Sequence, residues 1–275
     1  MKYLPLLWAN LQRKKLRTTL TFLSVVVAFL LFALLEAVNY ALTGGAELAG
    51  QDRLVTQHRV SLIQYLPLNY LSRIRGVAGV RVATSEDWFG GFYQDDRNQL
   101  TAMAVEPESF FEVYPEYAVS PDEMRAWHAT RTGAIVGRDV AERFGWKLGD
   151  RVPLRSNIFR KRDGSDTWDI DIVGIYHVED GDNTNVFLQY DYLNEARTFG
   201  RDEVGWIVMR IDDPTRAMAI ESTIDALFAN SSAETRTTTE SAFLQGFANQ
   251  MGNIGKIVTI VAAAVFFATS RCQPS

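Results

Sequence analysis

The first hydrophobic run of the chain is long enough to cross a membrane. Residues 18–35 form a run of 18 residues without a charge, and Val38 can extend it. As a helix the extended run covers about 30 Å, the thickness of a bilayer's hydrocarbon core. The pattern therefore predicts a transmembrane helix over residues 18–38. A cleaved signal peptide has a shorter apolar stretch and a small-residue cleavage site, so a retained anchor is favoured.

A second apolar run lies near the other end of the chain. Ile257–Ser270 contains 14 uncharged residues, which cover about 21 Å as a helix and are too short to cross alone. Thr237-x-x-Glu240 matches a capping box. Hydrophobic residues at helical spacing follow it, at Phe243, Phe247, Met251 and Ile254. We therefore expect a helix that leaves the polar domain and forms a second transmembrane segment over residues 251–270, with Lys256 reaching the interface. A buried core helix is the alternative.

Between the two apolar runs, strand-like and helix-like patterns alternate. Each segment has alternating or helical hydrophobic spacing and is bounded by Gly, Pro or Asp-Gly turns. The predicted strands are 77–82, 101–105, 133–137, 151–155, 168–172, 186–188 and 206–211. The predicted helices are 68–74, 138–144 and 214–228. The fold class expected is an α+β extracytoplasmic domain between an N-terminal and a C-terminal transmembrane helix.

Charge is distributed unevenly along the chain. All 33 acidic residues lie between Glu36 and Glu240, and residues 36–255 carry a net charge of −12. Such a surface repels phosphate backbones, so nucleic acid is excluded as a partner. Cytoplasmic segments collect Lys and Arg, which predicts a cytoplasmic N-terminus and an extracytoplasmic middle domain. The basic residues that flank the predicted spans are Arg13, Lys14, Lys15, Arg17, Lys256 and Arg271.

Cysteine usage excludes disulfide bonds from the middle domain. The single cysteine, Cys272, lies at the far C-terminal end. The domain must therefore be stabilised by its hydrophobic core. The 16 Phe and 6 Trp of the chain are compatible with a core of one or two subdomains.

Several short motifs follow one another in a characteristic order. After the basic flank and the first apolar run come Ile74–Val80, Ala104–Phe111, Ala134–Val152, Ile172–Ile175 and Val186–Leu188. This order resembles the MacB/FtsX-type permeases of ABC transporters over nearly the whole chain. Ala104 stands where that family more often has Gly.

The resemblance implies a MacB-like periplasmic core domain of two lobes over residues 39–250, with an inserted lobe at about 126–200. A cytoplasmic segment of residues 1–17 and a tail of residues 271–275 would complete the chain. The resemblance also implies a permease-type subunit in the cell (inner) membrane that binds or passes substrates, or transmits force. Its implied partners are a separate ABC ATP-binding subunit, a further permease chain, a periplasmic adaptor and the lipid membrane.

Permeases of this type normally have four spans and contact the ATPase through a cytoplasmic loop after the second. Because this chain ends soon after its second apolar run, we expect a truncated permease that depends on partners. Tyr3–Lys15 is basic and partly amphipathic, which suits a position on the membrane surface. A membrane-anchored binding or scaffold module without transport activity is the alternative.

The sequence offers no catalytic, cofactor-binding or metal-binding constellation. His58, His128 and His177 are the only histidines, and none has zinc-motif spacing. The acidic residues after His177 lack the ligand spacing of a calcium loop, so a solvated loop is favoured. G-x-S-x-G and phosphate-binding motifs do not occur. The protein is therefore expected not to be an enzyme; a periplasmic hydrolase is a third hypothesis without such a constellation.

Two other short features have competing interpretations. Gly90-Gly91 lies beside Trp88, Phe89 and Phe92, which favours a turn flanked by core aromatics over a substrate-contact loop. Arg160-Lys161-Arg162 follows a predicted strand and precedes the Asp163-Gly164 turn signal. A solvated hairpin tip is favoured there over a lipid or partner contact.

Overall fold

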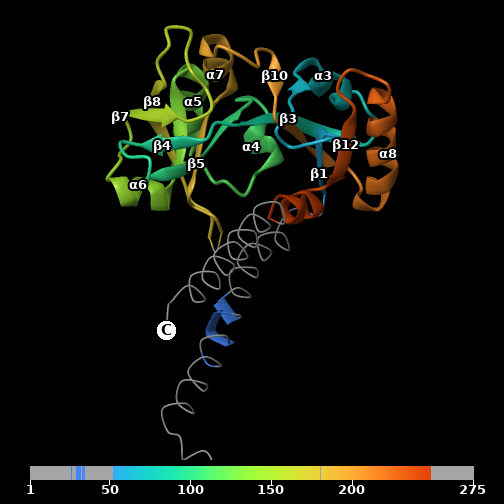
Figure 1. Cartoon of the computed structure of the whole chain (residues 1–275), viewed down its shortest axis with the longest axis horizontal. Coiled ribbons are helices and arrows are strands. Elements are labelled where there is room, and N and C mark those ends of the chain that lie inside the picture. Colours follow the sequence, from blue (N-terminus) through green and yellow to red (C-terminus); the bar gives the residue numbers. More distant parts are fainter. Residues whose placement is uncertain (1–25, 27–28, 32, 35–51, 180, 249–275) are drawn as a thin grey trace, which may run out of the picture. The chain divides into compact units, whose positions relative to one another are not determined.

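A computed structural model describes residues 26, 29–31, 33–34, 52–179 and 181–248 (Figure 1). Residues 52–243 belong to one compact unit, and the other described residues belong to a second unit. The first unit is an α+β domain, as predicted from the sequence. The predicted second span, residues 251–270, lies outside the described residues, as do most residues of the predicted first span.

The described elements of the domain are short. Its strands are β1 (Arg53–His58), β2 (Leu66–Pro67), β3 (Val80–Trp88), β4 (Gly91–Tyr93), β5 (Gln99–Val105), β6 (Gly133–Gly137), β7 (Arg151–Ser156), β8 (Thr167–Tyr176), β9 (Asn185–Gln189), β10 (Glu203–Val204), β11 (Trp206–Ile211) and β12 (Thr235–Thr239). Its helices are α3 (Asn69–Arg75), α4 (Phe110–Val113), α5 (Pro121–Ala129), α6 (Arg138–Phe144), α7 (Tyr190–Ala196), α8 (Ala217–Phe228) and a 3₁₀ turn at Pro214–Arg216. Residues 240–248 are helical.

The few described residues of the predicted first span are helical, at positions 26, 29–31 and 33–34. The large apolar side chains of Phe29, Leu30, Leu31 and Leu34 are 62–71% exposed. Within the described parts of the chain, no helix combines the length and the apolar character that crossing a bilayer requires.

Six strands close into a ring that forms one half of the domain, here called the barrel half. The order is β5-β4-β7-β8-β6-β9, and a parallel pairing of β9 with β5 completes the ring. Alternate residues of these strands share one hydrophobic core, because side chains of a strand alternate between its two faces. The core members on the strands are Leu100, Ala102, Ala104, Ala134, Val136, Val152, Leu154, Trp168, Ile170, Ile172, Val186 and Leu188.

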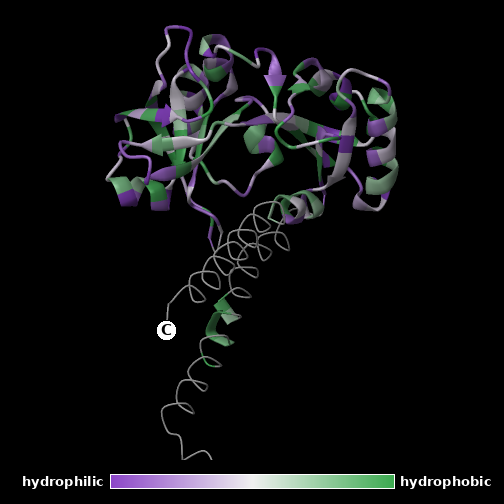
Figure 2. Ribbon diagram, viewed as in Figure 1, coloured by the Kyte–Doolittle hydropathy of each residue, from purple (hydrophilic) through white to green (hydrophobic). Residues whose placement is uncertain are grey.

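Four strands in the order β12-β1-β11-β3 form the other half, here called the sheet half. One face of this sheet packs against α3 and α8, which Figure 1 shows beside β3 and β12. The second core lies there, with Leu54, Ala83 and Ile207 on strands and Ile74 and Ile224 on helices. Figure 2 shows the two helices with mixed hydrophobic and hydrophilic residues, as expected for helices with one buried face.

Strand β3 connects the two halves of the domain. Its first part pairs with β11, and its last three residues, Glu86–Trp88, pair with β5. Glu86 pairs with both neighbouring strands, so it lies at the point where the sheet half becomes the barrel half. The boundaries 126–200 of the inserted lobe stay a prediction.

Most predicted segments are confirmed. The strand at Trp206–Ile211 and the helix at Arg138–Phe144 have the expected bounds. Gly145 ends that helix at φ 69°, a left-handed conformation that glycine adopts without steric cost. The predicted strand over 168–172 is the middle of β8, in which buried residues alternate with more exposed ones.

The capping box predicted at Thr237 is wrong. Thr237 lies inside β12, where its hydroxyl is 2.9 Å from that of Thr56 and donates to Asp225 at 2.8 Å. The helix starts at residue 240, and the hydroxyl of Thr239 accepts a bond from the Ala242 amide at 3.3 Å. Because Thr237 pairs with β1, the residue that caps the helix is Thr239, two positions after the predicted cap.

Candidate functional site

The two ends of the domain lie side by side. Strands β1 and β12 are antiparallel, and Leu54 faces Thr239. Asp52, at the start of the domain, bonds with the Arg210 guanidinium at 2.7 Å and accepts a backbone bond from Ile211. The segment that leads into the domain and the segment that leads out of it therefore meet at one end of β1.

A buried ionic cluster joins these ends. Arg53 is 7% exposed, and its Nε atom lies 2.5 Å from the carboxylate of Glu240, the first residue of the helix at 240–248. Its Nη1 atom lies 2.8 Å from Glu116, and its guanidinium stacks on the Tyr114 ring at 4.7 Å. Burial works to lower the pKa of Arg53, but the carboxylates of Glu240 and Glu116 outweigh it and raise the pKa. Arg53 is therefore a cation in this site.

Glu86 of β3 lies in the same cluster. It is 6% exposed and accepts a bond from the Trp206 indole at 3.0 Å. Burial raises the pKa of Glu86 to about 7, and hydrogen bonding by Tyr114 and Trp206 offsets this only in part. Phe243 packs on Trp206 with ring centroids 5.5 Å apart. The five residues Arg53, Glu86, Tyr114, Glu116 and Glu240 are called the Arg53 cluster below.

A second buried ion pair lies on the opposite face of β3. Asp87 follows Glu86, and consecutive strand residues point to opposite faces. Its carboxylate lies 2.6 Å from Nη1 of Arg197, and both side chains are at most 1% exposed. Nη2 of Arg197 donates to the Glu203 carbonyl at 2.6 Å and to Asn194 at 3.0 Å. Burial raises the pKa of Asp87 to about 7, although Arg197 works against that rise.

Arg197 also contacts aromatic rings from both halves of the domain. Its guanidinium lies 5.5 Å from the ring centroids of Phe159 and of Tyr190. Phe159 belongs to the core of the barrel half, and Tyr190 belongs to the core of the sheet half. Breaking a buried ion pair by removing one partner typically costs about 3–5 kcal/mol. The Asp87–Arg197 pair therefore holds the two halves in one arrangement.

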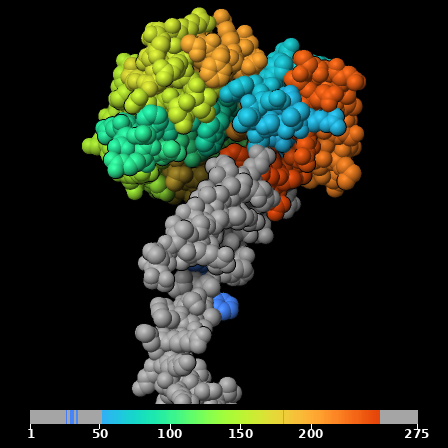
Figure 3. Space-filling model, in the orientation of Figure 1, coloured from blue at the N-terminus to red at the C-terminus, as the bar shows by residue number. Residues whose placement is uncertain are grey.

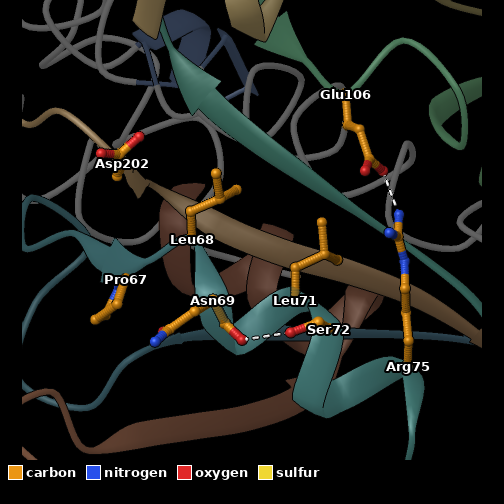
Figure 4. A pocket seen from close by; sticks show the side chains of 8 residues that line it. All are labelled: Pro67, Leu68, Asn69, Leu71, Ser72, Arg75, Glu106 and Asp202. Carbon is orange, nitrogen blue, oxygen red and sulfur yellow. Dashed lines mark hydrogen bonds and ion pairs between the residues drawn. The ribbon is translucent and has the colours of Figure 1, made fainter.

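An open hollow of about 510 Å³ lies beside α3. Figure 4 shows Leu68 and Leu71 between Asp202 on one side and the Arg75–Glu106 pair on the other. Arg75 also donates to the Ala83 carbonyl at 2.8 Å, so its guanidinium attaches α3 to β3. The hydroxyl in the lining, that of Ser72, donates to the Asn69 carbonyl at 2.9 Å and has no hydrogen bond to the carboxylates of Glu106 or Asp202, so the hollow holds no nucleophile paired with a base.

The structure separates the histidines considered in the sequence. His58 ends β1 and accepts a bond from the Val60 amide at 3.2 Å, and His128 lies on α5. Nδ1 of His177 is buried and has no hydrogen-bond partner among the described residues. Groups of three or more metal-ligating side chains do not occur in the described part of the chain. Asp180 is outside that part.

Three other features considered in the sequence remain: the membrane-flanking basic residues, the Gly90-Gly91 turn and the Arg160-Lys161-Arg162 run. The membrane-flanking residues Arg13, Lys14, Lys15, Arg17, Lys256 and Arg271 all lie outside the described residues. Gly90 adopts φ 60° next to the fully buried Phe89, as expected for a turn flanked by core aromatics. Arg160 and Arg162 are exposed in the loop between β7 and β8.

The residues that form the two buried clusters were not predicted from the sequence. One signal for them was present: Glu86-Asp87 stands directly before Trp88-Phe89 within a strand of nine residues. Two adjacent acidic residues inside a strand are unusual, since both faces of the strand then carry a charge.

Comparison with known proteins identifies the fold. Residues 19–227 match the family described as the MacB-like periplasmic core domain. The extracellular domain of the noncanonical ABC-type transporter YknZ from Gram-positive bacteria is similar in structure, with a TM-score of 0.50 and 10% identity over 68% of this chain and 100% of that chain. The periplasmic region of MacB from Actinobacillus actinomycetemcomitans has a TM-score of 0.51 and 12% identity over 73% of this chain and 94% of that chain.

A search of curated protein sequences gave no match. At such low identities the two solved structures bear on the fold alone, whereas the family match covers most of the chain. Members of this family are the extracytoplasmic domains of permeases that work with ATP-binding subunits. The chain therefore belongs to the MacB-like periplasmic core domain family of the MacB/FtsX-type ABC transporter permeases.

Proposed function

We propose that this chain is a non-catalytic membrane subunit of an ABC transporter and that it acts together with a separate ATP-binding subunit. Helices over residues 18–38 and 251–270 would hold it in the cell membrane, with the N-terminus in the cytoplasm. The domain of residues 52–243 would transmit motion of these helices to substrates or partners outside the cytoplasm. The family match and the long uncharged run of residues 18–35 support this proposal.

The Arg53 cluster is the main observation in support of a role in transmitting motion from the membrane helices to the domain. It ties the first residues of the domain to Glu240, where the chain leaves it, by a buried ion pair of 2.5 Å. Because the two ends are held together, movement of either predicted span would move the domain as a body instead of separating β1 from β12. The Asp87–Arg197 pair would carry that movement from the sheet half to the barrel half.

Coexpression with the ATP-binding subunit tests the proposal. The full chain and that subunit would be purified together, reconstituted in nanodiscs and assayed for ATP hydrolysis. We expect a stable complex whose hydrolysis rate differs severalfold from that of the ATP-binding subunit alone. An ATP-binding subunit with its phosphate-binding lysine replaced serves as the control for contaminating activity.

Two other outcomes would contradict the proposal. A complex with an unchanged hydrolysis rate would favour the scaffold or binding module without transport activity. Failure of the two chains to associate would contradict the proposal that this protein is a subunit of an ABC transporter. Replacing Arg53 with Met tests transmission, since we expect that variant to form the complex but to lose the change in hydrolysis. Tryptophan fluorescence of the same complex checks that the destabilised domain is still folded under the assay conditions.

A further inference from the structure

Two segments from different parts of the chain form one exposed tip on the domain. The loop of residues 157–166 connects β7 and β8, and residues 197–202 connect α7 and β10. The amide of Thr198 donates to the Arg160 carbonyl at 3.0 Å, and the amide of Arg162 donates to the Ala196 carbonyl at 2.9 Å. These backbone bonds fix the two segments side by side. Figure 3 shows the same neighbourhood at the surface, where yellow-green and orange atoms meet.

Apolar side chains are exposed at this tip. Phe199 is 47% exposed and stacks on the buried Phe159, with ring centroids 5.3 Å apart. The ring centroids of Tyr65 and Phe159 are 6.5 Å apart. Ile63, two residues before Tyr65 in the chain, is 86% exposed. Phe199 is therefore presented to solvent on the Phe159 ring, and Ile63 is exposed two residues before the Tyr65 ring that contacts Phe159.

Exposed cations lie on the same two segments of the tip. Arg160 and Arg162 are exposed, and no carboxylate of the described residues lies within ion-pairing distance of either. Arg201 is also exposed, and its nearest carboxylate, that of Asp202, is 3.9 Å away. Residues 36–255 as a whole carry a net charge of −12. The same two segments also carry the exposed carboxylates of Asp163 and Asp202, so the tip has only a small excess of cations on an otherwise acidic domain.

The base of the tip is held rigidly. Arg197 lies under the ring of Phe159 at 5.5 Å and is fixed by Asp87. Lys161 is half-buried and packs its amine over the Trp168 ring at 5.2 Å. A rigid base lowers the entropy that is lost when exposed side chains bind a partner.

We propose that this tip binds an anionic lipid surface. Ile63 and Phe199 would enter the headgroup region, and Arg160 and Arg162 would contact lipid phosphates. Proteins that bind membrane surfaces use exposed apolar residues to enter the headgroup region and neighbouring cations to contact anionic lipids. A protein partner is less well matched, because a stable protein interface takes roughly 800 Å² from each side, more than two or three exposed side chains provide.

Vesicle capture by the full chain tests the proposal. The chain would be reconstituted in nanodiscs of phosphatidylcholine, immobilised through a terminal tag, and mixed with fluorescent vesicles. We expect capture of vesicles made from equal parts of phosphatidylcholine and phosphatidylglycerol, and little capture of vesicles of phosphatidylcholine alone. Empty nanodiscs give the background. Capture should fall as salt rises, since exposed charges are screened.

Substitutions at the tip locate the binding surface. The double variant Arg160→Gln/Arg162→Gln should weaken capture about 30-fold, because each arginine near an anionic surface contributes a factor of about 5. Phe199→Ser should also weaken it. The matched controls are Arg81→Gln and Met218→Ser, which remove an exposed cation and an 81% exposed apolar side chain outside the tip; both should bind as the unchanged protein does.

Direct insertion can be measured at Ile63. In a Cys272→Ser background, an environment-sensitive dye on Ile63→Cys should shift its emission to the blue with anionic vesicles and not with neutral ones. Absence of capture by the unchanged protein, equal capture of neutral vesicles, or equal loss in the tip and control variants would each overturn the proposal.

Discussion

The buried carboxylate of Glu86 makes the stability of this domain depend on pH in an uncommon direction. Burial raises its pKa from 4.5 to about 7. Between these values the folded protein binds a proton that the unfolded chain does not bind. The contribution of Glu86 to the free energy of unfolding is therefore most favourable below about pH 4.5, falls as the pH rises, and is a penalty above about pH 7.

The size of the penalty follows from the pKa difference. One pKa unit corresponds to about 1.4 kcal/mol, so the charged form of Glu86 costs about 3 kcal/mol in the folded state. Glu86→Gln removes the charge and keeps an oxygen that can accept the bond from Trp206. We expect this variant to raise the free energy of unfolding by up to about 3 kcal/mol at pH 8, and to change it little at pH 5.

Urea unfolding of the full chain in detergent, followed by tryptophan fluorescence, measures this difference. Trp206 donates to Glu86 directly, so its emission reports on the site. A gain of about 3 kcal/mol corresponds to roughly 6–12 °C in the melting temperature of a domain of this size. Glu142→Gln, an exposed position on α6, is the control and should have no effect at either pH. A loss of stability at pH 8, or an equal effect at both pH values, would contradict a raised pKa of Glu86.

Four further substitutions test the packing, the ionic contacts and the conformation of the helix at 240–248. Arg53→Met should lower the free energy of unfolding by about 3–5 kcal/mol at pH 8, because Glu240 is left buried without its cation, and by less at pH 5; urea unfolding at both pH values checks this. Arg197→Met should cost a similar amount, about 3–5 kcal/mol, and limited proteolysis should then cut between the two halves; an intact, equally stable domain would contradict it. Gly137→Ala places a Cβ atom 2.0 Å from the Asn183 carbonyl oxygen and should cost at least about 2 kcal/mol in the same assay. Gly246→Ala, where nothing lies within 4 Å, should instead stabilise the helix by about 0.5–1 kcal/mol.

Segments with local periodicity could be predicted from the sequence. In β8, Trp168, Ile170 and Ile172 alternate with acidic residues, and the structure buries the three apolar side chains completely. Gly145 marked the end of α6 because a left-handed residue is needed there. Both signals depend only on residues that are close in sequence, so distant parts of the chain do not alter the structure that they predict.

Features that depend on distant pairing could not be predicted. Glu86 and Asp87 occupy a strand whose middle, Ala83-Thr84-Ser85, has no hydrophobic alternation. Their burial follows from pairing with β11 and β5, which are distant in sequence. Arg197 follows a short helix and has the sequence context of a surface residue. Only the approach of Asp87, 110 positions earlier, gives it a buried partner.

The position of β12 shows how a correct motif can be assigned to the wrong element. Thr237-x-x-Glu240 fits a capping box, but the same threonine also suits a strand, since β-branched residues favour extended structure. The bonds of Thr237 with Thr56 and Asp225 decide between the two. Neither partner is close to Thr237 in sequence, so the pattern alone could not resolve the choice.

An extracytoplasmic location of the domain underlies its proposed role in the transporter. Leu148 is 55% exposed and lies in the barrel half, so Leu148→Cys in a Cys272→Ser background gives a single accessible thiol. Gln12→Cys in the same background marks the predicted cytoplasmic segment. With a membrane-impermeant maleimide on intact spheroplasts, we expect labelling at position 148 and none at position 12 until the cells are lysed. Labelling at position 148 only after lysis would contradict an extracytoplasmic domain.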